Sequence, residues 1–575
     1  MVESNSTKDF IKAKLIDLKH NKLALTLLII IIILGIFIRL NDYSNVGYWN
    51  DDIATIPASL LWFYPHTFYP SLAADAEPPI GIYLIGKGCM MSGVDFSPVS
   101  KVLPNFYVGR DLLLGKQMLE ARGYCHFPIY LFGILFFISI IILSFLLLNK
   151  KATLYSVSFF AFLPYVLKYS RWIKPDIISW FFITLGLIFL WLAYRLEKGQ
   201  KNEILFFIIA SSFFGLSQGV KEPSIMFMVL LGIIIIVKYW KEITLNIKTL
   251  LNHKPELKIP FLSVIYSAIA YLFFVLLPYG FNLKQVYENI KFKATVSPGI
   301  TEISLNKQFL TSIKTFLVET NTLDILVILL AVYVIYKLIK IPKQKHQKFI
   351  LTFFIFSLLC LIPFTALNVF YAYVPFAISF VLLMSLAFDK RSNPLIEKIK
   401  PSRIIIYIFL IIYIIFSFAH ALNLSPYFTP NDSISCLILK DECDLQRQAL
   451  GNMATEEVAD KLTEIMNANE TFYGPGGIIY TYIRQDEGVV QYYTMQAIEK
   501  EFGRPPKIED MLKYFQMPDG RTIRYLLIMP HSGKNERFEY EGFYEIEDKF
   551  KPNYRVPIQN ITEAKIYDIY NLQPI

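Results

Sequence analysis

The chain has 575 residues, of which 54% are hydrophobic, 16% aromatic and 18% charged. Soluble globular domains carry about 25% charged residues, so this composition excludes a soluble globule and indicates a protein with many membrane-spanning helices. The formal net charge of +9 comes from Lys and Arg residues that cluster between the apolar runs. These clusters match cytoplasmic loops, and we therefore predict no nucleic-acid partner.

Eleven apolar runs are long enough to cross the membrane, since about 30 Å of hydrocarbon takes roughly 20 helical residues with wide tolerance. They cover residues 23–40, 127–148, 152–169, 176–194, 204–220, 223–237, 259–278, 323–339, 349–367, 370–388 and 404–420. We interpret 349–388 as two helices because it is too long for one and because Pro363 and Asn368 offer a break. The sequence therefore predicts an α-helical polytopic membrane protein with about eleven spans.

The loop charges predict the orientation of these spans. Basic residues precede the first run and recur in every second loop, which the positive-inside rule assigns to the cytoplasm. Residues 1–22 are then cytoplasmic, and residues 23–420 form the membrane domain with two long outer loops, 41–126 and 279–322. Residues 421–575 lie outside. We expect a multi-pass protein of the plasma membrane with a cytoplasmic N-terminus.

Four of the five cysteines fall in segments that this topology places outside, where disulfides persist. Spacing alone allows two interpretations. Either Cys89 pairs with Cys125 and Cys436 with Cys443, or all four thiols are free.

The hydrophilic segments carry shorter predicted elements. In the first outer loop, the apolar runs Ile53–Tyr64 and Ile80–Met91 are too short to span and suit short helices at the interface. In the tail, residues Thr455–Met466 have helical spacing, whereas Arg524–Met529 and Ala564–Tyr570 have the composition of strands. We predict that the tail forms a small α/β domain.

An acidic pair, Asp51-Asp52, follows closely on the first predicted helix, and Glu77-Pro78-Pro79 follows in the same loop. A carboxylate near the hydrocarbon boundary is costly unless it is solvated, paired or used, so the pair predicts a functional site. The alternative is a solvated turn in which Asp52 caps a helix.

These residues and three later motifs resemble those of the GT-C glycosyltransferases, in particular the protein mannosyltransferase-like and aminoarabinose-transferase-like enzymes. The later motifs are Ser170-Arg171-Trp172-Ile173-Lys174-Pro175-Asp176, Gly215-Leu216-Ser217-Gln218-Gly219-Val220-Lys221-Glu222-Pro223 and Phe370-Tyr371-Ala372-Tyr373-Val374-Pro375. Two positions depart from the pattern: Glu77 stands where members often have lysine, and Phe370 where they often have arginine.

The resemblance implies sugar transfer from a polyprenyl-phosphate donor to an acceptor hydroxyl on the outer side, with inversion. It implies Asp51 as general base. Asp52 would orient the substrate or contribute to the electrostatics of the site, and Asp176 would contact either the substrate or the residues that surround it. The phosphate and the rest of the substrate would contact Arg171, Lys174, Lys221, Glu77 and Tyr373. For the basic residues, the alternative role is anchoring at the interface by snorkelling.

Cofactors and partners follow from the same resemblance. The donor is a polyprenyl-phosphate sugar, the acceptor is a protein, lipid or polysaccharide, and membrane lipids surround the spans. No cofactor is assigned, although Mg²⁺ or Mn²⁺ could bind at Asp51 and Asp176 because paired carboxylates near phosphate attract divalent cations. The competing hypotheses are a transporter or flippase of lipid-linked sugars and a non-catalytic surface-assembly protein.

Overall fold

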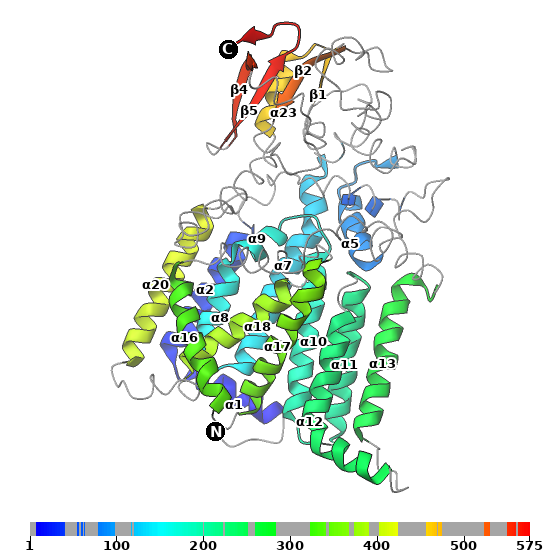
Figure 1. Cartoon of the computed structure of the whole chain (residues 1–575), viewed down its shortest axis with the longest axis vertical. Coiled ribbons are helices and arrows are strands. Elements are labelled where there is room, and N and C mark those ends of the chain that lie inside the picture. Colours follow the sequence, from blue (N-terminus) through cyan, green and yellow to red (C-terminus); the bar gives the residue numbers. More distant parts are fainter. Residues whose placement is uncertain are drawn as a thin grey trace.

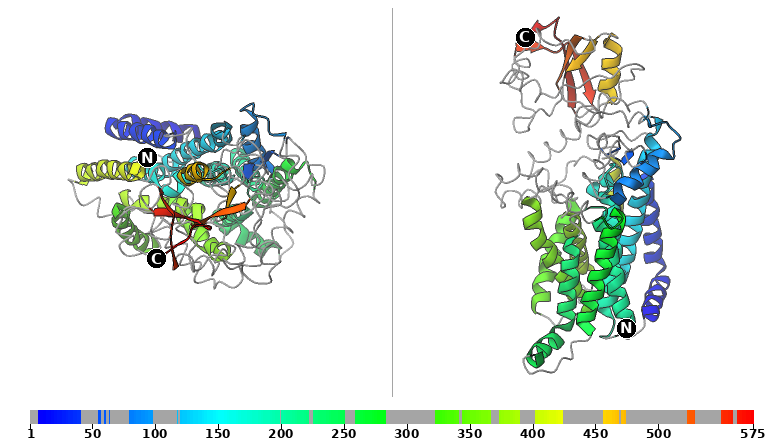
Figure 2. Two further views of the ribbon diagram at one scale, coloured as in Figure 1. Left: turned by 90° about the horizontal axis from the view of Figure 1, so that it is seen from above. Right: turned by 90° about the vertical axis from the view of Figure 1, so that its right-hand side faces the viewer.

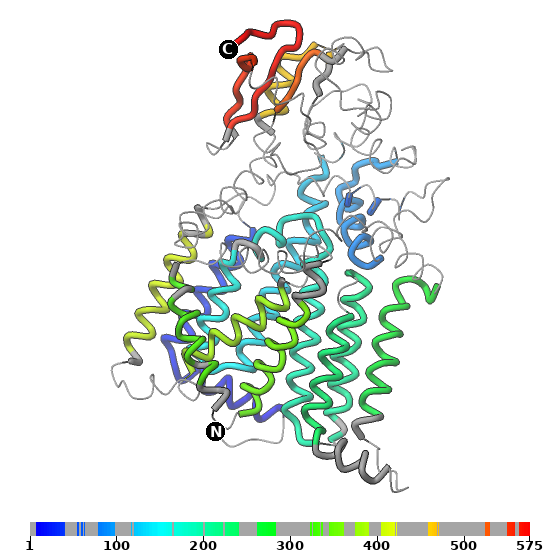
Figure 3. Tube along the Cα trace, in the orientation of Figure 1, coloured from blue at the N-terminus to red at the C-terminus, as the bar shows by residue number. Residues whose placement is uncertain are grey.

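The structure is a computed structural model, and Figure 3 distinguishes its described residues from those drawn in grey. It describes residues 7–40, 55–56, 59–60, 63, 79–97, 117, 120–198, 200–221, 225–250, 259–282, 322–340, 344–366, 373–389, 402–423, 456–467, 470–473, 522–528, 549–558 and 562–575.

The described part of the chain is mostly helical, and each of the predicted apolar runs coincides with helical residues (Figure 1). The helices are α1 (Thr7–Lys19), α2 (Lys22–Leu40), α5 (Pro79–Met90), α7 (Arg122–Leu147), α8 (Lys150–Phe162), α9 (Pro164–Tyr169), α10 (Asp176–Arg195), α11 (Lys201–Gln218), α12 (Met226–Leu250), α13 (Ile259–Leu276), α16 (Thr322–Lys340), α17 (Lys345–Ala366), α18 (Tyr373–Ser385), α20 (Ser402–Asn423) and α23 (Glu456–Ile465). The short 3-10 helices are η3 (Leu277–Tyr279) and η6 (Leu386–Phe388).

Four helical segments of the described residues are long and apolar enough to cross a membrane. They are Lys22–Leu40, Arg122–Leu147, Asp176–Arg195 and Leu262–Tyr279. The predicted class, a helical integral membrane protein, is confirmed at this level. The number of eleven spans stays a prediction.

Two of the predicted apolar runs contain a break in the structure, of which only the second was predicted. The run 152–169 is divided at Leu163 because Pro164 starts α9 and has no backbone N–H with which to continue α8. The run 349–388 forms two helices as predicted, but Pro363 lies inside α17, which ends at Ala366. The predicted boundary, between 367 and 370, falls between the end of α17 and the start of α18 at Tyr373, which confirms the division into two helices.

Glycines allow close approach between neighbouring helices of the bundle. A Cβ atom on Gly186 of α10 would lie 2.3 Å from Cε1 of Phe214 in α11, and one on Gly35 of α2 would lie 2.7 Å from Cε1 of Phe137 in α7. Helices in lipid pack through such small residues because their apolar surfaces gain little by leaving the hydrocarbon. These contacts pack α10 against α11 and α2 against α7. A ring contact between Phe136 of α7 and Trp180 of α10 joins the two pairs into one body.

A buried carboxylate connects the later helices to this body. Asp324, in the first turn of α16, is buried and accepts hydrogen bonds from the hydroxyl groups of Tyr155 in α8 and Tyr413 in α20, at 2.7 Å and 2.9 Å. A polar group inside an apolar bundle is costly unless it is hydrogen-bonded, so this cluster specifies how the three helices pack.

The tail contains a four-stranded sheet in the order β1-β2-β5-β4. Its strands are β1 (Glu470–Tyr473), β2 (Thr522–Ile528), β4 (Tyr554–Ile558) and β5 (Thr562–Asp568); β3 (Phe550–Lys551) pairs with β6 (Gln573–Pro574). β1 and β2 are parallel, whereas β5 runs antiparallel to both β2 and β4. α23 coincides with the predicted tail helix, and β2 and β5 coincide with the two predicted strands.

The two ends of the bundle carry different elements. Figures 1 and 2 show the N-terminus and α1 at one end, and the sheet beyond the other end, with α5 between the sheet and the helices. α5 covers the second predicted interface helix. Of the first, the described residues 55–56 and 59–60 are helical.

Candidate active site

The N-terminal end of α5 lies where predicted motifs meet. α5 begins at the last residue of Glu77-Pro78-Pro79, and the backbone N–H of Ile80 donates a 3.1 Å hydrogen bond to the carbonyl oxygen of Gly219. Gly219 belongs to the motif that contains Lys221. Two motifs that are some 140 residues apart by their numbers are thus joined through the backbone.

Gly81 brings the third motif to the same place. A Cβ atom on Gly81 would lie 2.3 Å from Cβ of Pro175 and 3.2 Å from Cγ1 of Val220, so a glycine is required here. Pro175 directly precedes Asp176, and Val220 directly precedes Lys221. The first turn of α5 therefore packs against the residues next to two candidate ionic side chains.

Asp176 is the first residue of α10, and its side chain is 0% exposed. The backbone N–H groups of Ile178 and Ser179 donate 3.1 Å hydrogen bonds to the carbonyl oxygen of Pro175, which starts the helix. The positive end of the helix dipole stabilises a carboxylate at this position. The fold thus supplies a fixed acidic group beside α5.

Arg171 lies in the turn between α9 and α10 and is 1% exposed. Its Nη2 atom donates a 2.7 Å hydrogen bond to the carbonyl oxygen of Ile38, which is in the last turn of α2. A cation is favourable there because the C-terminal end of a helix carries partial negative charge. The turn before α10 is therefore bonded through Arg171 to the end of α2, the helix that precedes the loop with Asp51-Asp52.

Arg39 also stabilises the packing at the end of α2. It was not among the predicted site residues. Its Nη1 donates to the carbonyl oxygens of Gly35 and Ala161 at 2.8 Å and 3.1 Å, and its Nη2 donates to that of Phe160 at 3.0 Å. The guanidinium carbon also lies 4.5 Å from the ring centroid of Phe137. The sequence signal for this role is an arginine in the last turn of an apolar helix, where a charge is costly without partners.

The two predicted lysines have different surroundings. Lys221 follows the end of α11, is 4% exposed, and donates its backbone N–H to the carbonyl oxygen of Ser217 at 2.8 Å. Lys174 is half-buried, with Nζ 3.8 Å from the ring centroid of Trp172. Lys168 also approaches this ring, at 5.4 Å. Lys221 is thus a buried cation beside α5, whereas Lys174 makes a cation–π contact nearer the surface.

Several predicted site residues fall outside this description. Asp51, Asp52 and Glu77 lie outside the described residues, and Tyr373 begins α18 without a described side chain. Among the residues that the structure describes, no group of three or more His, Cys, Asp or Glu side chains could hold a metal ion. The metal hypothesis, which includes Asp51, stays a prediction.

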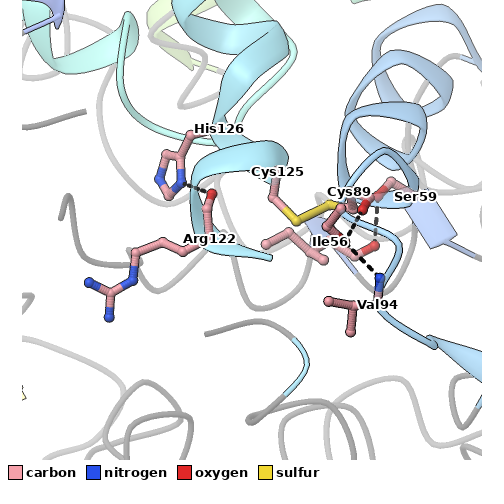
Figure 4. Close-up of a disulfide and its surroundings, with 8 residues drawn as sticks. Ile56, Ser59, Cys89, Val94, Arg122, Cys125 and His126 are labelled. Atoms are coloured by element: carbon pink, nitrogen blue, oxygen red, sulfur yellow. Dashed lines mark hydrogen bonds between the residues drawn. A yellow bond between two sulfur atoms is a disulfide. The ribbon is translucent and has the colours of Figure 1, made fainter. Parts of the chain in front are cut away.

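A disulfide fixes the other end of α5. Cys89, near the end of α5, is bonded to Cys125 in the first turn of α7 (Figure 4). A Cβ atom on Gly86 would lie 2.4 Å from the carbonyl oxygen of Ser59, so the start of the same loop packs on this helix as well. The predicted Cys89–Cys125 pair is confirmed, whereas Cys436 and Cys443 lie outside the described residues.

The family model of dolichyl-phosphate-mannose protein mannosyltransferases matches residues 30–294 of the chain. The matched range begins in α2 and includes α5, the turn before α10 and Lys221. The predicted resemblance to the GT-C glycosyltransferases is confirmed. A comparison with curated protein sequences gives no significant match.

Two solved structures are similar to the chain over most of its length. ArnT from Cupriavidus metallidurans, bound to undecaprenyl phosphate, is 10% identical over 94% of this chain and 98% of that chain, with a TM-score of 0.44. The Archaeoglobus fulgidus oligosaccharyltransferase, in complex with Zn and sulfate, is 15% identical over 80% of this chain, with a TM-score of 0.42. The chain spans 61% of the length of that oligosaccharyltransferase.

Proposed function

We propose that the chain is a membrane glycosyltransferase that transfers a sugar from a polyprenyl-phosphate donor to an acceptor hydroxyl, with inversion. The main support is the meeting of the motif segments at the first turn of α5, where Gly81 lies against Pro175 and Val220. All of them lie within the range matched by the family model, whose description names a dolichyl-phosphate sugar as donor.

The chemistry requires a base and a stabilised leaving group. Asp51 accepts the proton of the acceptor hydroxyl group. At the same time the oxygen atom of that hydroxyl group attacks the anomeric carbon from the face opposite the phosphate. The bond between that carbon and the phosphate oxygen breaks, and the phosphate leaves on its lipid. Asp52 orients the substrate, and Asp176 binds sugar hydroxyl groups beside α5.

Positive charge near this site suits the departing phosphate. Lys221 is the candidate for direct contact because it is a buried cation that directly follows Val220, which packs on the first turn of α5. Arg171 acts mainly by holding α2, to which it donates a hydrogen bond. Lys174 would meet the head group nearer the surface, and Glu77 and Tyr373 complete the proposed substrate contacts.

Two observations support an outer location for the reaction. The Cys89–Cys125 disulfide lies at the end of the bundle that carries α5, and disulfides persist in oxidising compartments. Exposed lysines of α1 lie at the other end, as the positive-inside rule requires of a cytoplasmic face. The site would therefore face outwards, on the same side as the C-terminal sheet.

The test uses the full-length protein in lipid nanodiscs with a polyprenyl-phosphate sugar and a panel of protein, lipid and polysaccharide acceptors. We expect Asp51→Asn to lower the transfer rate by about 100-fold or more, because a general base contributes about 10²–10⁴-fold. The matched control is Asp95→Asn, since Asp95 is an exposed acid of the same loop that hydrogen-bonds locally to Ser97.

Each outcome separates the hypotheses. Loss of transfer in Asp51→Asn with normal rates in Asp95→Asn supports the proposed base. Equal rates in both variants refute it. Movement of the lipid-linked sugar across the bilayer without transfer to any acceptor would favour the flippase hypothesis instead.

A further inference from the structure

The helix α1 has one face docked on the bundle. The guanidinium carbon of Arg195 lies 3.6 Å from the ring centroid of Phe10, and Lys150 pairs with Asp17 at 3.0 Å. Lys14 donates a hydrogen bond to the carbonyl oxygen of Leu148. These contacts attach α1 to the connection between α7 and α8 and to the end of α10, so its orientation is fixed.

The opposite face of α1 is exposed and basic. Lys8, Lys12 and Lys19 are spaced by four and seven residues, which places them on one face of a helix with 3.6 residues per turn. All three side chains are exposed. The apolar side chains of Leu15 and Ile16, 53% and 46% exposed, flank this row of lysines on its two sides.

The position of α1 in the chain places its exposed face near the membrane surface. α1 ends at Lys19, and the apolar helix α2 begins at Lys22, so α1 lies where a spanning helix leaves the hydrocarbon. Basic residues next to the end of a spanning helix attract anionic head groups, and apolar side chains beside them are favourable at the acyl boundary. Lysine side chains there extend towards the phosphates while their methylene groups stay in apolar surroundings.

We propose that the outward face of α1, defined by Lys8, Lys12, Leu15, Ile16 and Lys19, binds anionic phospholipid head groups of the leaflet on the N-terminal side. The lysines contact the phosphates, and Leu15 and Ile16 enter the acyl boundary. This inference does not depend on the proposed sugar transfer, because the face lies at the end of the bundle away from α5 (Figure 1).

The test measures binding of a fluorescent phosphatidylglycerol by anisotropy to the full-length protein in uncharged detergent micelles. Fluorescent phosphatidylcholine serves as the zwitterionic probe. In Lys8→Gln/Lys12→Gln/Lys19→Gln we expect at least a tenfold weaker affinity for phosphatidylglycerol, because each lysine near an anionic surface contributes about fivefold. Affinity for phosphatidylcholine should not change.

Three further variants and one competitor sharpen this test. Replacing the same lysines by arginine keeps the charge and should restore binding, whereas Lys87→Gln/Lys549→Gln/Lys551→Gln removes three exposed lysines of α5 and the tail and should have no effect. Leu15→Ser/Ile16→Ser should weaken binding although every charge remains. Soluble glycerol phosphate should compete poorly, since it lacks acyl chains.

Other results would overturn the proposal. Unchanged phosphatidylglycerol binding in the glutamine variant would exclude the lysines, and an equal loss in the Lys87, Lys549 and Lys551 variant would show that only net charge matters. Full binding by Leu15→Ser/Ile16→Ser, with strong competition from glycerol phosphate, would indicate a site for free anions. Tighter binding of an acidic peptide than of the lipid would indicate a protein partner.

Discussion

Arg171 and Ile38, 133 residues apart in the chain, are joined by a 2.7 Å hydrogen bond from Nη2 to a carbonyl oxygen. Arg39, the residue after Ile38, donates hydrogen bonds to carbonyl oxygens near the ends of α2 and α8. Two neighbouring cations are thus held together by the carbonyl groups of helix ends. This arrangement fixes the point from which the acidic loop departs.

We therefore predict that Arg171→Ala lowers both stability and activity. A hydrogen bond to a charged group contributes about 1.5–3 kcal/mol, so we expect a loss of that order in the free energy of unfolding. Loosening the end of α2 should also lower sugar transfer by more than about tenfold, since small displacements of a catalytic group are costly. Thermal unfolding and transfer rates in nanodiscs measure the two effects. Lys87→Ala, which removes an exposed cation of α5, should change neither.

Gly81 offers a steric test of the candidate site. In Gly81→Ala the new methyl group would overlap Pro175, at 2.3 Å, and must push α5 away from the start of α10. Overpacking of this kind costs about 1–3 kcal/mol, and we expect transfer activity to fall with it. The matched control is Gly232→Ala in α12, where a Cβ atom meets nothing within 4 Å. An inactive Gly232→Ala protein, or a normal Gly81→Ala protein, would contradict the prediction.

The disulfide predicts a defined chemical result. In a Cys436→Ser/Cys443→Ser background, alkylation without reductant should modify Cys360 alone, and reduction should expose two more thiols by mass. Replacing Cys89 and Cys125 by serine should lower the free energy of unfolding by about 2–4 kcal/mol. Alkylation of three thiols without reductant would show that this bond is absent.

The buried cluster around Asp324 predicts coupling between helices. Tyr155→Phe and Tyr413→Phe each remove one hydrogen bond to its Oδ1 atom and should each cost about 0.5–1.5 kcal/mol. The double variant should cost more than the sum, because the carboxylate then loses both donors. Tyr336→Phe, at an exposed tyrosine of α16, should be neutral. Thermal unfolding of the unchanged protein and of the four variants provides the comparison.

Glu470 in β1 predicts how the sheet depends on pH. Burial raises its pKa, but hydrogen bonds from Asn467 and Arg524 outweigh this and hold the pKa below the usual value of 4.5. Because the pKa is lower in the folded state, the carboxylate stabilises the sheet above about pH 4.5, and this contribution is lost as the pH falls through the folded pKa. Hydrogen exchange of β1 and β2, corrected for intrinsic rates, should show faster opening on acidification. In Glu470→Gln this acid step should shrink.

The helices could be predicted from sequence because their signal is local. Each apolar run coincides with helical residues, since about 20 apolar residues are sufficient to define a spanning helix. The break at Leu163 could also have been predicted from the sequence, because Pro164 marks it. The division of 349–388 into two helices was predicted correctly, although Pro363 itself lies within α17, because a proline inside a long apolar helix does not always end it.

The site could be predicted only in part because its assembly is not local. Sequence motifs predicted Asp176 and Lys221 as site residues, but the approach of their neighbours Pro175 and Val220 to α5 depends on the space left by Gly81. The role of Arg39 depends on carbonyl groups of α8 that lie about 120 residues away in the chain. Such partners become visible only when the helices are packed.

The order of the strands has a consequence for biosynthesis. β5 lies between β2 and β4 in the sheet, yet it is the last of these four strands in the chain. β2 can therefore complete its pairing only after the ribosome has synthesised β5, when all the apolar helices have already been released to the insertion machinery. Until then β1 and β2 have an unpaired edge, which a chaperone of the receiving compartment could protect from aggregation.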